Sequence, residues 1–320
     1  MLRSSTLRSD LLLLLAAVIW GFAFVAQRMG MDHIGPFLFN AIRFALGAGV
    51  MVVVHRITDR RLPTADRRLP TADRRLPTAD RRLPTIYGIL LGLILFAGAT
   101  FQQVGIVYTT AGNAGFITGL YVILVPVFGI FSGQKARVNL WGGALIATVG
   151  MYFLSVTEAF SISKGDLFVL TGAVFWAVHV LYTGWVSPKV SAIRLAAVQY
   201  AVCALLSLFA ALIFEKNTLS GIYDAAIPLL YGGFLSVGVA FTLQIVGQKK
   251  APPAHAAIIL SLEAVFAVVG GMLILSETMT DRKWFGCALM LAGMLLAQVK
   301  SRQSAVSSQQ SAVSSKYGEN

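Results

Sequence analysis

Long apolar segments follow one another along almost the whole chain, and they decide what it can fold into. A helix that spans a membrane needs about 20 mostly apolar residues. Segments of nearly that length occupy about 11–29, 37–54, 86–102, 113–131, 140–156, 167–186, 192–214, 225–247, 254–275 and 284–299. With 57% hydrophobic and 12% charged residues, the chain has too few polar residues to cover its apolar ones in a water-soluble fold. We therefore expect an all-α integral membrane protein with ten transmembrane helices.

The fourth apolar segment depends on where one long apolar stretch is divided. Asn113 to Phe131 makes one span of suitable length, and this choice leaves Gln102 to Thr110 as a short connection. Pro126 then lies inside the span, where it removes a backbone hydrogen bond and is expected to kink the helix. The kink is open to two interpretations, a static bend or a moving gate.

The chain also repeats itself. Residues 10–20 (DLLLLLAAVIW) are similar to residues 166–176 (DLFVLTGAVFW), so Trp20 and Trp176 hold equivalent positions. Five apolar segments fall in each half, and an odd number gives the halves opposite orientations in a membrane. We therefore expect two inverted five-helix repeats, at 10–156 and 165–299. Many secondary transporters build a central site with two gates from paired repeats, so the duplication favours transport.

Basic residues are distributed unevenly between the two sets of loops. Twenty Lys and Arg residues fall on the side that carries both termini, and five fall on the other side. Without eight Arg residues of a tandem repeat the ratio is still 12 to 5. Because Lys and Arg favour the cytoplasmic side, we expect a multi-pass protein of the inner (cytoplasmic) membrane with both termini cytoplasmic. The net charge of +12 is spread over several loops, which disfavours nucleic acid as a partner.

Two low-complexity segments stand apart from the apolar ones. Residues 59–85 repeat the heptapeptide DRRLPTA three times and begin a fourth copy. A proline in every copy excludes a coiled coil, so we interpret 59–85 as a disordered cytoplasmic loop. Attraction of its arginine pairs to anionic lipid is the alternative. Residues 300–320 are polar and are expected to form a disordered cytoplasmic tail.

The sequence contains no motif for a cofactor, a metal or a nucleotide. The zinc motif HExxH, the phosphate-binding loop GxxxxGK and an intramembrane pair of aspartates are all absent. Cys203 and Cys287 lie inside apolar segments, so neither a disulfide nor a thiolate metal site is expected. We expect no cofactor, no metal and no catalytic residue. A membrane-embedded enzyme acting on lipid or isoprenoid substrates, and a non-transporting scaffold, are the alternatives to a transporter.

Two charged residues lie deep inside apolar segments, where charge is costly and usually serves a function. A buried carboxyl group can lose its charge by taking up a proton, so Glu263 is either a proton-coupling group or a hydrogen-bonded structural residue. Arg43 cannot lose its charge. It is either an anchor for a substrate carboxylate or the ion-pair partner of a helix end.

Further polar and aromatic residues at similar depth are candidates for the lining of a central substrate cavity. Some have a structural alternative, because His179 also suits a hydrogen-bonded core position and the two equivalent tryptophans also suit packing. Aromatic walls would fit an amphipathic organic substrate. With Arg43, the candidates are Trp20, Asn40, Gln103, Asn113, Thr118, Tyr121, Trp176, His179, Tyr182, Tyr200 and Gln244.

The order of several short motifs is similar to that of a known family. The motifs are WGFAFV from Trp20, RFAL from Arg43, AGFITGLYVILVP from Ala114, WGGAL from Trp141, SLEAVFA from Ser261 and WFGCAL from Trp284. In this order, from about residue 10 to 299, the chain resembles EamA-type members of the drug/metabolite transporter (DMT) superfamily. Two positions depart from the family pattern: Ala264 stands where a proline often follows the glutamate, and Gln134 is the first-half counterpart of Glu277.

The resemblance implies ten helices in two inverted repeats around a central cavity. It also implies export or exchange of small metabolites, often amino acids or related compounds. We accordingly expect a secondary transporter that exports a small organic metabolite by alternating access. The expected partners are that small molecule and the lipid bilayer, and the sequence leaves a homodimer open.

Overall fold

The computed structural model describes residues 2–61, 83–131, 138–155 and 163–298. Within these ranges the chain is helical and contains no strand. The helices of the first half are α1 (Leu2–Gly30), α2 (Pro36–Arg61), α3 (Leu83–Ile106), α4 (Ala111–Gly119), α5 (Tyr121–Phe131) and α6 (Val138–Ser155). Those of the second half are α7 (Lys164–Val186), α8 (Ala192–Phe214), α9 (Leu219–Asp224), α10 (Ala226–Leu230), the π-helix η4 (Tyr231–Phe241), α11 (Thr242–Gln248), α12 (Pro253–Leu260), α13 (Glu263–Ile274) and α14 (Asp281–Gln298).

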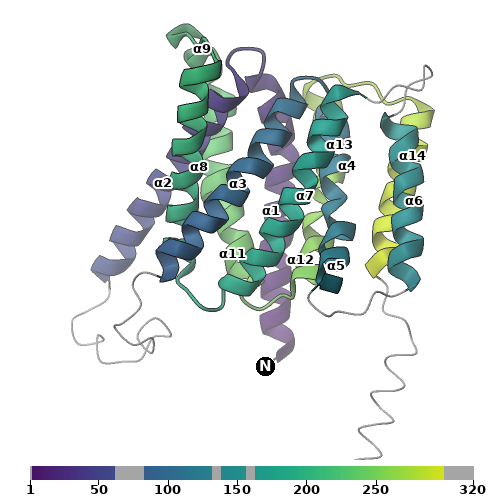
Figure 1. Ribbon diagram of the computed structural model, residues 1–320, viewed down its shortest axis with the longest axis horizontal. Coiled ribbons are helices and arrows are strands. Elements are labelled where there is room, and N and C mark those ends of the chain that lie inside the picture. The colour runs from purple at the N-terminus through teal and green to yellow at the C-terminus, as the bar shows by residue number, and fades with distance from the viewer. Residues whose placement is uncertain (1, 62–82, 132–137, 156–162, 299–320) are drawn as a thin grey trace, which may run out of the picture.

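Ten membrane-crossing segments can be traced through these elements. In the described part of the chain, eight segments are long and apolar enough to cross a membrane, and three of them are continuous runs of consecutive elements: α4–α5, α10–η4–α11 and α12–α13. The other two segments are α6 and α14, each 18 residues long, which pack against each other at one edge of the bundle (Figure 1). The all-α fold with ten helical spans is confirmed.

The helices pack in pairs that repeat between the two halves. In Figure 1, α1 rises from the lower end of the bundle to the upper end, whereas its counterpart α7 descends. The contact of α3 with α7 has its equivalent in the contacts of α1 with η4 and α11. Helices α2 and α8, which hold the same place in their halves, pack against each other, as do α6 and α14. This exchange of partners is what a pair of inverted repeats produces.

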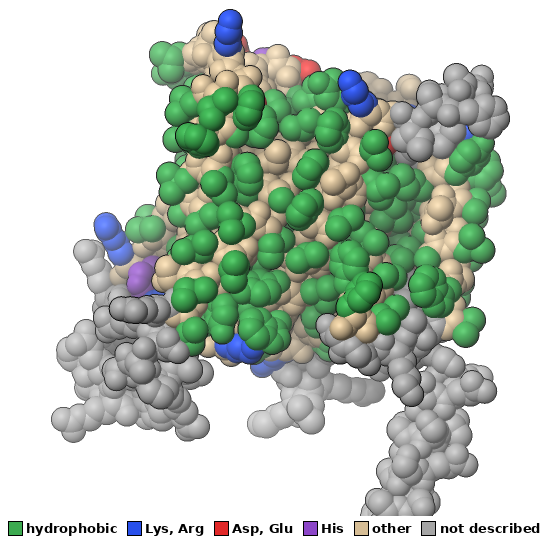
Figure 2. All heavy atoms as spheres, in the orientation of Figure 1, with side chains coloured by type: hydrophobic (Ala, Val, Ile, Leu, Met, Phe, Trp, Pro, Cys, Tyr) green, Lys and Arg blue, Asp and Glu red, His purple; other side chains and the backbone are tan. Residues whose placement is uncertain are grey.

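The molecular surface fits a lipid environment. Hydrophobic side chains cover the middle of the face shown in Figure 2, and the Lys and Arg side chains visible there lie near its upper and lower edges. Phe209, Leu212 and Leu273 are among the large apolar side chains exposed on the surface of the protein. A water-soluble protein would rarely expose such a continuous apolar belt.

Several expected boundaries differ from the structure. Helix α3 continues to Ile106, so Gln102 and Gln103 are helical and buried rather than part of a connection. The fourth span breaks at Leu120, between α4 and α5, and Pro126 lies inside α5. The break at Leu120 was not expected from the sequence, and the kink expected at Pro126 stays a prediction.

The low-complexity segments are only partly covered by the structure. The first three and last three residues of the segment 59–85 are helical, since α2 ends at Arg61 and α3 begins at Leu83. Proline at the second position of a helix, as in α3, needs no backbone donor and is well tolerated. Residues 62–82 and the tail 300–320 lie outside the described residues.

Glycine lets α6 and α14 approach closely. A Cβ atom on Gly150 would lie 2.6 Å from the backbone nitrogen of Met290 and 2.7 Å from the carbonyl oxygen of Gly286. A Cβ atom on Gly293 would lie 2.5 Å from the carbonyl oxygen of Gly143. Small residues of this kind hold membrane helices together where lipid supplies no hydrophobic drive.

Carboxylates of the second half cap helices of the first half at the upper end of the bundle. Glu277 accepts hydrogen bonds from the backbone N–H groups of Ala111 (2.7 Å) and Gly112 (3.0 Å) at the start of α4. Glu215 accepts from those of Phe37 (2.7 Å) and Leu38 (2.9 Å) at the start of α2. A negative charge at a helix N-terminus satisfies donors that have no partner within the helix. These caps join the two halves.

We expect Glu277→Ala to destabilise the folded protein, because it leaves two half-buried N–H groups of α4 without their acceptor. Hydrogen bonds to a charged group contribute about 1.5–3 kcal/mol each, so the melting temperature in detergent should fall by several degrees. Asp224→Ala serves as the control, since Asp224 is exposed at the same end of the bundle. Equal melting temperatures for the two variants would contradict the capping role.

Candidate functional site

Two broken helices cross in the middle of the bundle. The fourth span is interrupted at Leu120 and the ninth at Ser261 and Leu262. Helix α4 packs against α13, and α5 packs against α12, so each half of one broken helix meets the opposite half of the other. Tyr121 and Glu263 are each the first residue after the break. Transporters with inverted repeats place their sites at such discontinuous helices.

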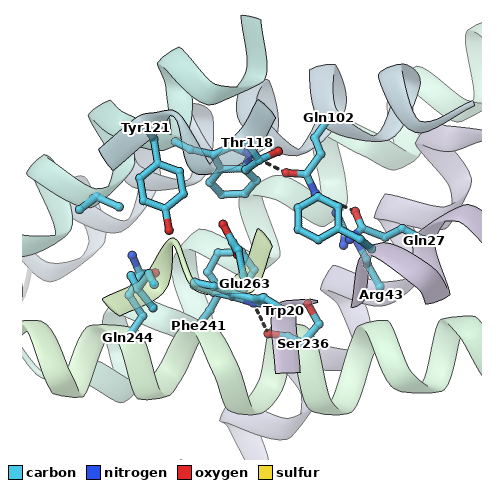
Figure 3. Close-up of a pocket in the computed structure, with 14 residues that line it drawn as sticks. Trp20, Gln27, Arg43, Gln102, Thr118, Tyr121, Ser236, Phe241, Gln244 and Glu263 are labelled. Atoms are coloured by element: carbon cyan, nitrogen blue, oxygen red, sulfur yellow. Dashed lines mark hydrogen bonds between the residues drawn. The ribbon is translucent and has the colours of Figure 1, made fainter. Parts of the chain in front are cut away.

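A pocket lies beside this crossing. Its volume is about 480 Å³, including the space at its mouth, and side chains from both halves of the chain form its wall. The lining residues are Trp20, Phe24, Gln27, Arg43, Gln102, Thr118, Tyr121, Trp176, Val180, Ser236, Phe241, Gln244, Leu260 and Glu263. Figure 3 shows ten of them by label.

Aromatic rings form the apolar wall of the pocket. Phe241 packs between the two equivalent tryptophans, with ring centroids 4.6 Å from Trp20 and 5.8 Å from Trp176. Both tryptophans pack against each of the two large core clusters of the bundle. The pocket therefore lies between these clusters, and the two tryptophans of its apolar wall contact both of them.

The indole N–H groups of the two tryptophans are bonded across the repeat in equivalent directions. Trp20 donates from Nε1 to the carbonyl oxygen of Ser236 at 3.2 Å, in the eighth span. Trp176 donates from Nε1 to Oε1 of Gln102 at 2.7 Å, in the third span. Gln102 in turn donates to Oε1 of Gln27 at 3.0 Å. Each indole ring is thus held in one orientation by a hydrogen bond to the other half of the protein.

The π-helix η4 contributes one side of the pocket. Ser236 and Phe241 line it from η4, and Gln244 lines it from α11. A π-turn contains an additional residue compared with an α-turn, so it leaves backbone carbonyls less regularly bonded and is frequent at functional sites. Here the carbonyl oxygen of Ser236 accepts the indole donor of Trp20. The equivalent third span, α3, is a regular α-helix over its described length.

Arg43 is the cation of the site and is 3% exposed. Its Nε donates to Oδ1 of Asn40 at 2.9 Å, and Asn40 donates from Nδ2 to the carbonyl oxygen of Ala99. The guanidinium carbon lies 4.9 Å from the ring centroid of Phe44 and 5.7 Å from that of Phe39. Cation–π contacts of this kind stabilise a desolvated charge. Arg43 takes part in neither of the ion pairs formed among the described residues, Arg28–Asp32 and Asp10–His255.

Glu263 lies in the middle of the pocket as viewed in Figure 3, between Arg43 on one side and Tyr121 and Gln244 on the other. The Tyr121 hydroxyl points toward the Glu263 carboxyl group, and Gln244 lies on the same side. Glu263 is 4% exposed. The Tyr121 hydroxyl is close enough to Glu263 to interact with its carboxyl group. The hydroxyl group of Thr118 and the amide oxygen of Gln244 are buried and have no hydrogen-bond partner among the described residues. Buried polar groups normally have a partner, so these atoms are suited to bind a solute or water.

The structure brings seven of the thirteen sequence candidates together around this pocket. The other six lie behind its wall or elsewhere. Asn40 supports Arg43, Gln103 donates to the backbone of Gln27, and Asn113 lies in the first turn of α4. His179 contacts Oε1 of Gln199 at 3.1 Å, Tyr200 contacts the Thr242 hydroxyl, and Tyr182 packs with Tyr87 and Trp185.

Several lining residues were not among the candidates. Phe24 and Gln27 follow Trp20 by four and seven positions, the spacing that places residues on one face of a helix. Val180 follows Trp176 by four positions in the same way. These three could have been found by extending the face of each tryptophan. Phe241 and Leu260 carry no such signal, because an apolar side chain in a membrane span usually faces lipid or other helices.

Comparisons with known proteins agree with this arrangement. The model of the EamA-like transporter family matches residues 7–156 and again residues 163–298, one match in each half. An uncharacterized transporter of Archaeoglobus fulgidus is 30% identical over 92% of this chain and 87% of its own length. The uncharacterized transporter YoaV of Bacillus subtilis is 24% identical over 87% of this chain and 92% of its own length.

Two further comparisons bear on membrane location and fold. The uncharacterized inner membrane transporter YedA of Escherichia coli is 23% identical over 87% of each chain. A crystal structure superposes with a TM-score of 0.63 at 20% identity, over 91% of this chain and 96% of that chain, and supports the fold alone. The double family match, the ten helical spans and the pocket between the halves lead to one conclusion: this chain is a multi-pass membrane protein of the EamA-like transporter family, within the DMT superfamily.

Proposed function

We propose that the protein is a secondary transporter that exports a small organic metabolite across the cytoplasmic membrane by alternating access at the pocket described above. The observation that carries this proposal is the position of the pocket: its wall is shared by both halves and lies where two broken helices cross. Rocking of one half against the other would open such a site to each side in turn.

The chemistry of the wall supports a small organic solute. Three aromatic rings supply a flat apolar surface, and Arg43, Glu263 and the unsatisfied polar atoms supply orientation. A concave, mostly apolar site with a few convergent polar groups is the usual form of a small-molecule site.

Transport can be tested by counterflow in proteoliposomes with a panel of radiolabelled metabolites, with and without a pH gradient. We expect Phe241→Ala to abolish counterflow of the solute that the wild type carries, because this ring joins the two tryptophans of the wall. Phe234→Ala is the matched control, since Phe234 lies in the same π-helix and is 44% exposed on the lipid side. Counterflow that survives Phe241→Ala would contradict a transport role for the pocket.

We also propose that the lower end of the bundle, where α1 begins and α14 ends in Figure 1, faces the cytoplasm. Lys216 is exposed at the upper end, after α8, and Lys249 is exposed at the lower end, after α11. In a background with Cys203→Ala and Cys287→Ala, we expect an impermeant thiol reagent to label Lys216→Cys in intact cells. Lys249→Cys should be labelled only after the membrane is permeabilised. The reverse pattern would overturn the orientation.

A further inference from the structure

The charge of Arg43 is not balanced by any described carboxylate within ion-pair distance. The ion pairs among the described residues are Arg28–Asp32 and Asp10–His255. The one acidic residue in the pocket wall, Glu263, forms neither of them and lies between Arg43 and Tyr121 as viewed in Figure 3. A permanently charged guanidinium at membrane depth is costly unless an anion reaches it. The protein therefore supplies the cation of an ion pair at this site but not the anion.

Arg43 lines the pocket, and its other described neighbours, which include the buried thiol of Cys203, supply no carboxylate. Asn40 accepts from Nε alone, and Phe39 and Phe44 offer their ring faces rather than hydrogen-bond acceptors. Gln27 and Gln102 lie beside it in Figure 3, but their amide groups bond to each other and Gln102 also accepts from Trp176. The terminal nitrogens are therefore the donors available to a solute, in the fork geometry that suits a carboxylate.

The rest of the wall limits the shape and the charge of the solute that carries this carboxylate. Trp20, Trp176 and Phe241 present flat apolar faces next to the polar end formed by Arg43, Gln27 and Gln102. Arg43 is the only Lys or Arg among the lining residues. A dianion such as a phosphate ester would carry one charge more than Arg43 can balance, and an organic cation could not pair with Arg43.

We propose that the pocket recognises an organic monocarboxylate, with the carboxylate held by Arg43 and a flat apolar body packed between Trp20, Trp176 and Phe241. This substrate class rests on the proposed function of the same pocket. Binding joins the missing anion to the buried cation, so specificity comes from completing an ion pair that the empty protein lacks.

The test compares three probes that share one body and differ in charge. They are 3-(4-hydroxyphenyl)propionate, its uncharged primary amide, and the cation tyramine. Binding is measured with purified full-length protein in detergent or nanodiscs. We expect the carboxylate to bind about tenfold or more tightly than the amide, a difference of about 1.4 kcal/mol, and tyramine to bind most weakly. Equal affinity for carboxylate and amide, or tighter binding of tyramine, would overturn the proposal.

Two variants assign the preference to Arg43. Arg43→Gln should bring the carboxylate to the affinity of the amide. Asn40→Asp keeps the arginine but places a carboxylate against its Nε, so it should weaken carboxylate binding by a similar factor while binding of the amide changes little. Arg28→Gln is the control, since Arg28 is a partly exposed arginine at the end of α1. A carboxylate preference that persists in Asn40→Asp with a normal melting temperature would refute the role of Arg43.

The substrate class and the transport function can fail separately. Carboxylate-selective binding without counterflow in proteoliposomes would refute transport and leave the ligand class standing. Counterflow that is confined to neutral or cationic solutes would refute the ligand class and leave transport standing.

Discussion

Glu263→Gln is expected to abolish uptake driven by a pH gradient while exchange of substrate at equal concentrations continues. Glu263 is the only carboxyl group among the residues that line the pocket, and it begins the second half of the broken ninth span. Glutamine keeps the shape and the hydrogen-bonding oxygen but cannot take up and release a proton. A site that alternates between two sides can carry a proton only if such a group is present.

Both transport modes should be measured on a single proteoliposome preparation of this variant. Asp224→Asn is the matched control, since it removes a carboxyl group that is exposed at the upper end of the bundle. If the Glu263→Gln protein shows pH-driven uptake at the wild-type rate, Glu263 is a structural residue. Loss of both exchange and folding would point the same way.

Gly150→Val is expected to prevent accumulation of folded protein in the membrane. Its first additional carbon would already lie within 2.7 Å of two backbone atoms of α14, and backbone cannot turn aside as a side chain can. Overpacking in a tight interface costs about 1–3 kcal/mol and more where the backbone must move. Gly49→Val is the control, because a Cβ atom on Gly49 has no neighbouring atom within 4 Å.

The comparison is made by size-exclusion chromatography of detergent extracts, with fluorescence detection of a fused reporter. Gly49→Val should give the wild-type monodisperse peak, and Gly150→Val should give aggregate or no signal. Monodisperse Gly150→Val protein with an unchanged melting temperature would show that α6 and α14 can separate without cost.

The spans could be predicted because a lipid environment demands long apolar helices, a requirement that leaves a clear trace in sequence. The breaks in two of them could not. Pro126 is the visible helix breaker of the fourth span, yet the helix ends at Gly119. Ser261 and Leu262 interrupt the ninth span with no proline or glycine between them. Such turns are stabilised by the packing of α4 against α13 and α5 against α12, which involves residues far apart in the chain.

Those pocket residues that are unusual in a membrane interior could be predicted from the sequence. Arg43, Glu263 and the two equivalent tryptophans stand out in an apolar segment, and the structure brings all four to the pocket. His179 and Tyr200 stand out equally but bond to neighbouring helices one layer behind the wall. The polarity of a residue shows that it needs a hydrogen-bond partner. Only the fold shows whether the side chain meets another helix or faces the pocket.

The carboxylate caps make the two ends of the bundle unequal. At the upper end Glu215 and Glu277 of one half hold four backbone donors of the other. At the lower end α12 begins at Pro253, which follows Pro252, and neither proline has an N–H group. The ion pair described there, between Asp10 and His255, is partly exposed. If the protein works by alternating access as proposed, opening the upper end would have to break these hydrogen bonds, so we expect the empty protein to rest with its upper end closed. A carrier whose resting state is open toward one compartment binds solute from that compartment first. The resting state would then determine the side of the membrane on which the transport cycle starts.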